Sequence, residues 1–325
     1  MKKTVCDVLR LFLACALILA WGQSWAQSYP GRTIKFVVGY PPGGANDTLA
    51  RLLAQKMAEN LGNPVIVENR PGADGIIGTE YVAKSAPDGY TLLTGASGQM
   101  IFNPVLRDKL PYDPMRDFIP ITMLYSDPLV FAVHPSVPAA TLKELIDLAK
   151  ARPGKLFYAS AAPPFHVAIE SFKKLAGVEI VNIPYKGTAQ AVMATVSGEV
   201  SVVMMTAGSL IQQIRAGKLR PLAVTGDKRD PTVPDVPAMS ETGLGMRALS
   251  WSGMFAPSAT PPAIIEKLYS DMAVVLKSSY MKEKVAAIGY GTAVLGMAPA
   301  EFDAFYKSEF AYWSKAVKDL KLSVK

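Results

Sequence analysis

The sequence predicts an α/β protein made of two lobes, each with a mainly parallel sheet flanked by helices. Short apolar runs typical of strands alternate with segments whose apolar residues recur at helical spacing, first over residues 33–150 and again over residues 156–208. Glycine and other small residues follow most of these strands. Because open α/β sheets bind ligands at the carboxyl ends of their strands, we expect a ligand cleft between the two lobes.

In both blocks the expected strands and helices alternate regularly. In the first block, strands are predicted at residues 33–38, 64–68, 90–94 and 129–133, and helices at 49–58, 76–85 and 142–150. In the second block, strands are predicted at 156–159, 178–183 and 200–205, and helices at 166–176 and 189–197. Two further helices, 262–277 and 299–318, are expected to pack on the first lobe. The predicted lobes are residues 27–127 with 235–325, and residues 128–234.

Residues 1–26 are predicted to be a signal peptide that is removed on export. Basic residues precede an apolar run over residues 11–21, and Ser24 and Ala26 place small side chains where a cleavage site needs them. The apolar run is shorter than the roughly 20 residues that span a membrane. We therefore expect a periplasmic protein. A lipoprotein attached through Cys15 is the alternative, which the apolar residues after that cysteine disfavour.

Cysteine content and charge narrow the class of function. Both cysteines, Cys6 and Cys15, lie in the predicted signal peptide, so no disulfide is expected after its removal. The remaining chain has 31 basic and 26 acidic residues, a net charge of +5, and no basic run interleaved with aromatic residues. We therefore expect no nucleic-acid partner. His134 and His166 are isolated and form no zinc motif, and we expect neither a metal nor a cofactor.

The loop before the first predicted helix is the strongest candidate for a ligand site. Gly43 and Gly44 lie between a predicted strand and this helix, so the backbone can approach a ligand closely. A helix N-terminus has free amide hydrogens and a partial positive charge, which suit a small anion. We expect the amides of Gly43, Gly44 and Ala45 to hold a carboxylate. Asp47 either favours the first helical turn or contacts the ligand, and Tyr40 either packs in the core or covers the ligand.

Other strand ends supply further candidates, most of them with small or hydroxyl side chains. The second lobe offers Gly187, Thr188 and Ala189 at a predicted helix start, and Thr188 is the preferred ligand contact because its hydroxyl and its amide both lie there. His166 opens another helix and is interpreted as a hydrogen-bonded structural histidine rather than a catalytic one. The remaining ligand-binding candidates are Ala73, Ser97, Ser160, Phe165, His166 and Thr206.

Several motifs, taken in order, resemble the Bug or TctC family of periplasmic receptors of tripartite tricarboxylate transporters. They are Pro42-Gly43-Gly44 with Asp47 and Ala50-Arg51, the runs 67–73 and 87–92, His166, the run 184–188, Trp251-Ser252-Gly253 and Ala256-Pro257. The resemblance covers nearly the whole chain after residue 26. It implies a two-lobed periplasmic-binding-protein fold of type II, which closes on a small carboxylate held largely by backbone amides and ordered water. It also implies an inner-membrane permease or a sensor protein as partner. We expect a monomer.

The loop before His166 departs from the family pattern. Where the family has a small stretch rich in glycine and serine, residues 161–165 read Ala-Ala-Pro-Pro-Phe. The two prolines remove two amide donors, and Phe165 adds apolar area. A second carboxylate would lose partners at this loop. We therefore expect an aromatic or apolar mono- or dicarboxylate as the ligand rather than citrate.

Two other functions remain open. A binding protein for an inorganic anion such as phosphate or sulfate is one, because helix N-termini suit those ions too. A secreted α/β hydrolase is the other. However, Gly95-Ala96-Ser97-Gly98-Gln99 lacks the last glycine of a nucleophile elbow, and no acid is obviously placed to orient a histidine as a base. The sequence therefore favours a receptor over an enzyme.

Overall fold

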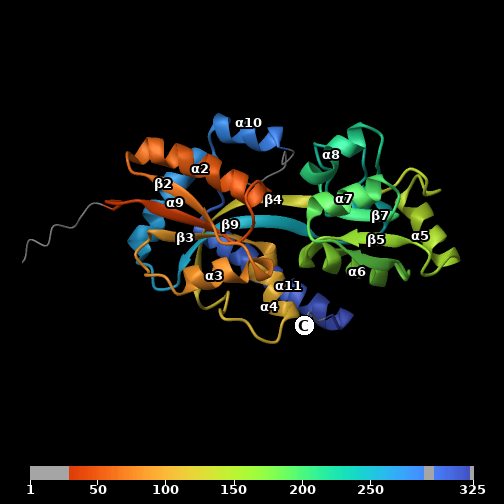
Figure 1. The fold of residues 1–325 in the computed structure, drawn as a ribbon, viewed down its shortest axis with the longest axis horizontal. Helices are drawn as coiled ribbons and strands as arrows, with labels where there is room; N and C mark the ends of the chain where they lie inside the picture. The colour runs from red at the N-terminus through yellow and green to blue at the C-terminus, as the bar shows by residue number, and fades with distance from the viewer. Residues whose placement is uncertain (1–28, 289–295, 323–325) are drawn as a thin grey trace, which may run out of the picture.

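One long strand, β4 (Phe118–Val133), connects the two halves of a mixed sheet (Figure 1). The computed structural model describes residues 29–288 and 296–322, so the predicted signal peptide lies outside the described residues. The partners of β4, all antiparallel to it, are β9 (Leu249–Pro257), β7 (Val202–Thr206) and β8 (Arg220–Val224). Up to Pro128 the strand pairs with β9, and from Leu129 onward it pairs with β7 and β8. We call the two sides the first and the second sheet half.

Helices cover both faces of the first sheet half. Its elements are β1 (Ile34–Val38), β2 (Val65–Asn69), β3 (Thr91–Ala96), α2 (Ala45–Leu61), α3 (Ile76–Ala83), α9 (Pro262–Leu276) and α10 (Ser279–Ala287). β1 pairs in parallel with β2 and β3, and β3 pairs antiparallel with β9. Successive side chains of a strand point to opposite faces. Accordingly, Phe36 packs in the core cluster under α2 and α9, whereas its neighbour Val37 packs in the cluster under α3.

The second sheet half repeats the strand–loop–helix order. Its further elements are α5 (Leu142–Ala151), β5 (Phe157–Ser160), α6 (Pro163–Ala176), β6 (Val181–Pro184), α7 (Thr188–Val196) and α8 (Ala207–Arg215). β5 pairs in parallel with both β6 and β7. The carboxyl ends of these strands therefore lead into α6, α7 and α8 at one edge of the sheet; the alternating pattern predicted α6 and α7 but not α8.

The last helix links the two sheet halves. The remaining elements are η1 (Ala73–Gly75), η2 (Gly98–Phe102), α4 (Asn103–Leu106), η3 (Met239–Thr242) and α11 (Pro299–Leu320). Near its start, α11 buries Phe302 against Trp251 of β9, with ring centroids 5.8 Å apart. Near its end, the carbonyl of Asp319 accepts a hydrogen bond of 2.9 Å from Lys174 of α6. The helix thus packs on the second sheet half as well as on the first, where we expected it.

The α/β fold is confirmed, but the sheet is more mixed than predicted. The sequence predicted only residues 129–133 of β4 as a strand, because Pro120 and Pro128 interrupt its earlier part. Proline cannot donate to a sheet, and the pairing with β9 is irregular next to Pro120, which accommodates the missing donor. Along the part of the chain that the structure describes, none of the helices has the length and apolar character needed to cross a bilayer.

Candidate functional site

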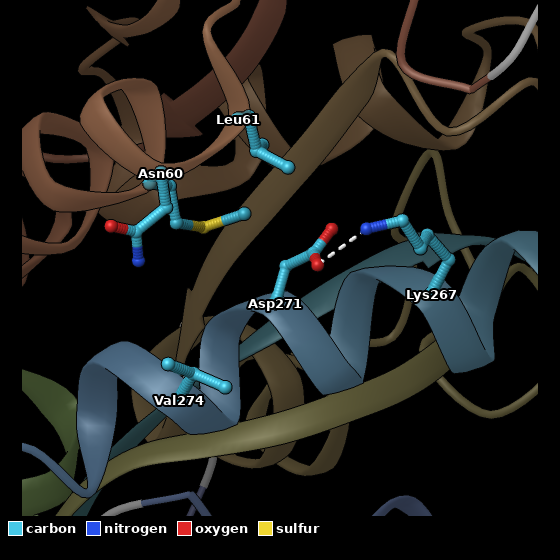
Figure 2. Close-up of a pocket in the computed structure, with 6 residues that line it drawn as sticks. Asn60, Leu61, Lys267, Asp271 and Val274 are labelled. Atoms are coloured by element: carbon cyan, nitrogen blue, oxygen red, sulfur yellow. Dashed lines mark hydrogen bonds and ion pairs between the residues drawn. The ribbon is translucent and has the colours of Figure 1, made fainter.

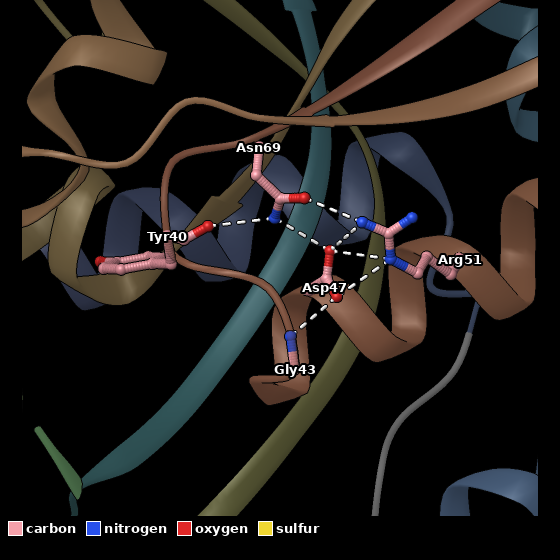
Figure 3. Close-up of polar contacts among 5 residues, drawn as sticks. All are labelled: Tyr40, Gly43, Asp47, Arg51 and Asn69. Atoms are coloured by element: carbon pink, nitrogen blue, oxygen red, sulfur yellow. Dashed lines mark hydrogen bonds and ion pairs between the residues drawn. The ribbon is translucent and has the colours of Figure 1, made fainter.

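The loop between β1 and α2 is held in place by an acidic side chain inside the helix. Gly43 has a positive φ of 89°, which favours glycine, and Gly44 is the last residue before α2. The amide of Gly43 donates a hydrogen bond of 2.9 Å to Asp47 Oδ2 (Figure 3). This amide is therefore occupied within the protein, whereas we expected it to face a ligand.

Asp47 is the centre of a polar cluster that joins the loop, α2 and β2 (Figure 3). Arg51 Nε lies 3.0 Å from both carboxylate oxygens of Asp47, and Asn69 Nδ2 donates to Asp47 Oδ1 at 2.9 Å. Asn69 Nδ2 also donates to the carbonyl of Tyr40 at 3.1 Å. Asp47 is 3% exposed. Its burial opposes ionisation, but the hydrogen bonds from Arg51, Gly43 and Asn69 outweigh that effect and lower the pKa of Asp47.

Both oxygens of Asp47 accept hydrogen bonds from protein groups, so the geometry gives this residue a positioning role. The cluster holds the loop against the sheet and leaves the following amides at the helix N-terminus. Within residues 29–288 and 296–322, the amides of Gly44, Ala45 and Asn46 have no protein acceptor, and the first helical bond runs from Thr48 to Gly44. These three amides can hold an anion.

Close backbone packing fixes the strand ends next to this loop. Gln99 Nε2 donates to Thr79 Oγ1 at 2.8 Å, and Gln99 Oε1 accepts from the amide of Ala96 at 3.0 Å. A methyl group added to Gly39 would lie 2.4 Å from Gln99 Nε2 and 3.0 Å from the carbonyl of Gly75. Glycine is thus required at position 39. The sequence analysis did not identify Gln99, because a lone glutamine carries no pattern that marks it.

Two other candidates of the first sheet half lie in the neighbouring turns. Ala73 is exposed and has a positive φ of 46°, and the next residue, Asp74, has a φ of 54°. Asn103 Nδ2 and Arg107 Nη2 hold Asp74 through its carbonyl and its carboxylate, at 3.0 and 2.7 Å. Ser97 is buried at the start of η2.

The first four residues of α6 offer no amide to a ligand. Pro163 and Pro164 are the first two residues of this helix and have no N–H. The next two amides, of Phe165 and His166, both donate to the carbonyl of Ala162 at 3.2 Å. The prediction that the helix begins at His166 is therefore wrong by one turn, since proline suits the first helical positions. Phe165 is half-buried and packs on the core clusters on either side of it.

His166 is hydrogen-bonded inside the second sheet half. The Tyr158 hydroxyl donates to Glu170 Oε1 at 2.7 Å and lies 2.7 Å from His166 Nδ1. Because the hydroxyl has one proton and gives it to Glu170, we infer that Nδ1 carries the proton that it shares with Tyr158. Burial lowers the pKa of His166, although the Glu170 carboxylate opposes this shift. This geometry agrees with a structural histidine.

The other candidates of the second sheet half lie at strand ends and helix starts. Gly187 precedes α7, where Thr188 and Ala189 are the first helical residues and where the first helical bond runs from Ala191 to Gly187 at 3.2 Å. The hydroxyl groups of two further candidates are each bonded to a neighbour, Ser160 to Asn182 Oδ1 at 2.7 Å and Thr206 to Ser209 at 2.8 Å. No hydrogen bond or ion pair between described residues links Thr188 or Thr206 to the first sheet half.

The two sheet halves meet above Gly98. A methyl group added to Gly98 would lie 2.7 Å from the Tyr40 hydroxyl and 3.8 Å from Pro164 Cγ. Tyr40 follows β1 in the first sheet half, and Pro164 lies in the first turn of α6 in the second. The structure thus brings Tyr40, the turn at Ser97 and the first turn of α6 together.

A separate hollow of about 440 Å³ lies between α2 and α9 (Figure 2). It is lined by Met57, Asn60, Leu61, Lys267, Asp271 and Val274. Met57 lies 13 residues along α2 from Gly44, which corresponds to about 20 Å. Lys267 and Asp271, one turn apart on α9, pair with each other at 2.5 Å. This hollow lies far from the strand-end loops, and none of the candidate site residues lines it.

Comparisons with known proteins give consistent matches over most of the chain. The family model described as "Tripartite tricarboxylate transporter family receptor" matches residues 49–322. The chain is 36% identical to protein BugT of Bordetella pertussis (strain Tohama I) over 316 residues, which is 96% of each chain. It is 34% identical to a solved structure described as R. palustris Rpa4515 with adipate, with a TM-score of 0.82 over 91% of this chain and 99% of that one. It is 31% identical to MatC from Rhodopseudomonas palustris with bound malate, with a TM-score of 0.78 over 89% of this chain and 100% of that one.

Proposed function

Because this chain belongs to the family of tripartite tricarboxylate transporter receptors, we propose that it captures one small organic carboxylate between two lobes and releases it unchanged to a membrane partner. Its family and fold are those of solute-binding receptors of the periplasmic type. Export through removal of residues 1–26, the lobe limits at residues 127/128 and 234/235, a permease or sensor as partner, and the absence of catalysis are parts of the same proposal.

The single observation that carries the carboxylate proposal is the start of α2. The amides of Gly44, Ala45 and Asn46 have no acceptor among the described residues, while Asp47 is tied to the protein and does not compete for them. In two relatives of this fold, the solved structures are described with adipate and with malate, which are both carboxylates. We propose that Thr188 and Ala189 at the start of α7 supply the facing donors from the second lobe.

Amide donors alone are strong enough for this task. A hydrogen bond to a charged group contributes about 1.5–3 kcal/mol, so four of them would contribute about 6–12 kcal/mol before ordering costs. Micromolar binding needs about 8 kcal/mol. A receptor of this kind can therefore bind its ligand without a buried arginine and still release it when the lobes open.

The start of α6 supports an apolar body for the ligand. Pro163 and Pro164 lack amide hydrogens, and those of Phe165 and His166 are used by the Ala162 carbonyl. These four residues give a second carboxylate no amide donor, so they suit a hydrocarbon or an aromatic ring better than a second charged group. We therefore propose an aromatic or apolar acid. Phosphate or sulfate is the second candidate, because the α2 amides suit those ions as well.

A thermal-shift screen tests the proposal directly. The protein without residues 1–26 is heated with benzoate, hexanoate, adipate, malate, citrate, phosphate or sulfate in large excess. A ligand present at 100 times its Kd stabilises the folded state by about 2.7 kcal/mol, which raises the Tm measurably. We expect stabilisation by benzoate, hexanoate or adipate and little by citrate. Stabilisation by phosphate or sulfate alone would favour the inorganic-anion alternative.

Substitution of Thr188 tests the second lobe. We expect Thr188→Ala to weaken binding of the best acid by about 1–3 kcal/mol, because one hydroxyl donor to a carboxylate is lost. Thr141→Ala is the matched control, since the Thr141 hydroxyl accepts from the Glu144 amide at the start of α5. The control should lower the stability without changing the affinity. Unchanged affinity in Thr188→Ala would remove that residue from the site.

A further inference from the structure

The Tyr40 hydroxyl is a donor that the described part of the protein does not use. The carbonyl of Tyr40 accepts from Asn69 Nδ2, but no hydrogen bond of its hydroxyl is found within residues 29–288 and 296–322. Two other phenols of the first sheet half behave differently. The hydroxyl of Tyr112 donates to the carbonyl of Gln99 at 2.8 Å, and that of Tyr29 donates to the carbonyl of Gly89 at 2.7 Å. The Tyr40 hydroxyl is not among the fully buried polar atoms that lack a partner in the described residues, so a molecule that enters from solvent can reach it.

The position of the ring shows which way this donor points. The side chain of Tyr40 extends away from Asp47 and Arg51, so it takes no part in the cluster that holds the loop (Figure 3). Its hydroxyl lies against Gly98, beside the Pro164 ring that approaches from the second sheet half. Glycine at position 98 leaves the space that the hydroxyl occupies.

We propose that the Tyr40 hydroxyl donates a hydrogen bond to an oxygen of the bound organic acid, at the point where the two sheet halves meet over Gly98. This inference rests on the proposed function and makes Tyr40 a specificity-determining residue of that site. The α2 amides hold the carboxylate, and Tyr40 is a side-chain donor next to the start of α6, whose first four residues offer no amide.

The chemistry of the phenol fits this role. Burial, together with the nearby Tyr112 and the Asp74 carboxylate, raises the pKa of Tyr40. The hydroxyl therefore stays protonated and remains a donor at every pH at which the protein is folded and a carboxylic acid is ionised.

The test compares Tyr40→Phe with Tyr29→Phe, which removes a phenol hydroxyl that has a protein acceptor. Without ligand, Tyr29→Phe should lower the Tm by about 2 °C, the order expected when one hydrogen bond is lost. Tyr40→Phe should leave the Tm unchanged or raise it, because no protein hydrogen bond is lost. A decrease as large as that of Tyr29→Phe would mean that the hydroxyl is bonded inside the protein and would overturn the inference.

Calorimetric titration with the acid that stabilises the wild type most gives the second readout. We expect Tyr40→Phe to weaken binding on the order of tenfold or more, as for loss of one donor to a charged oxygen, and Tyr29→Phe to bind like the wild type. Equal affinities of Tyr40→Phe and the wild type would overturn the inference while leaving the proposed function intact. A wild type that binds none of the acids in the screen would overturn the proposed function and this inference with it.

Discussion

The helix starts after β1 and after β5 share one architecture and differ in hydrogen-bonding capacity. After β1, an acid inside the helix takes up the Gly43 amide, and those of Gly44 and Ala45 have no acceptor among the residues that the structure describes. After β5, Pro163 and Pro164 remove two amides, and the Ala162 carbonyl takes up the next two. A helix N-terminus is therefore an anion site only where the surrounding residues leave its amides unused.

The largest expected effect concerns the close packing around Gly39, beside the loop before α2. Gly39→Ala should reduce the free energy of unfolding by on the order of 3 kcal/mol, since the methyl group would collide with Gln99 and with the backbone of Gly75. Gly44→Ala is the matched control, because nothing lies within 4 Å of its added methyl group. Urea unfolding measures both. Equal stabilities would contradict the view that close packing holds the loop in place.

The next effect concerns Asp47, the acid that positions the loop before α2. Asp47→Ala should cost about 2 kcal/mol of stability at neutral pH, because Gly43 and Asn69 lose an acceptor. The pKa of Asp47 is lowered in the folded state, so its contribution is present above about pH 4 and is lost as the pH falls through the folded-state pKa. The stability difference between wild type and variant should therefore shrink in acid. Asp147→Ala, which breaks an exposed ion pair with Lys143 in α5, is the control and should change stability by less than about 0.5 kcal/mol.

A third change would make the start of α6 resemble the start of α2. Pro163→Ala restores one amide at the start of α6, and we expect it to bind adipate about tenfold more tightly than the wild type does. Pro262→Ala makes the same change at the start of α9, far from the strand-end loops, and should leave the affinity unchanged. Calorimetry measures both variants. No gain with Pro163→Ala would show that the missing donor does not limit the choice of ligand.

The smallest effect concerns His166. Its pKa is lowered by burial, so the unfolded chain binds the proton more readily, and the stability of the wild type should decline as the pH falls below about 6.5. His166→Gln removes this contribution and should flatten that decline, which denaturant unfolding at several pH values can follow. Glu170 and Lys173, which also face this site, remain in the variant. An unchanged pH profile would show that His166 does not titrate differently on folding.

Much of the fold could be predicted because most of its strands and helices follow local patterns of apolar residues. The alternation of apolar runs and helical segments identified the parallel strands β1, β2, β3, β5, β6 and β7. Each of these strands begins and ends within three residues of its predicted bounds. The first part of β4 was missed, since Pro120 and Pro128 read locally as breaks. Its pairing with β9 joins segments about 130 residues apart, which no local pattern reveals.

The sequence by itself determined that two glycines precede α2 and that two prolines begin α6. The prolines have no amide hydrogen, so the sequence also determined which positions have an amide donor. Only the tertiary structure decided which of the existing amides are left for a ligand. Asp47 takes the Gly43 amide because Asn69 of β2 and Arg51 hold its carboxylate beside the loop. The physical reason is competition: a donor satisfied by a protein group cannot also bind a ligand at full strength, and the competing groups come together only in the folded chain.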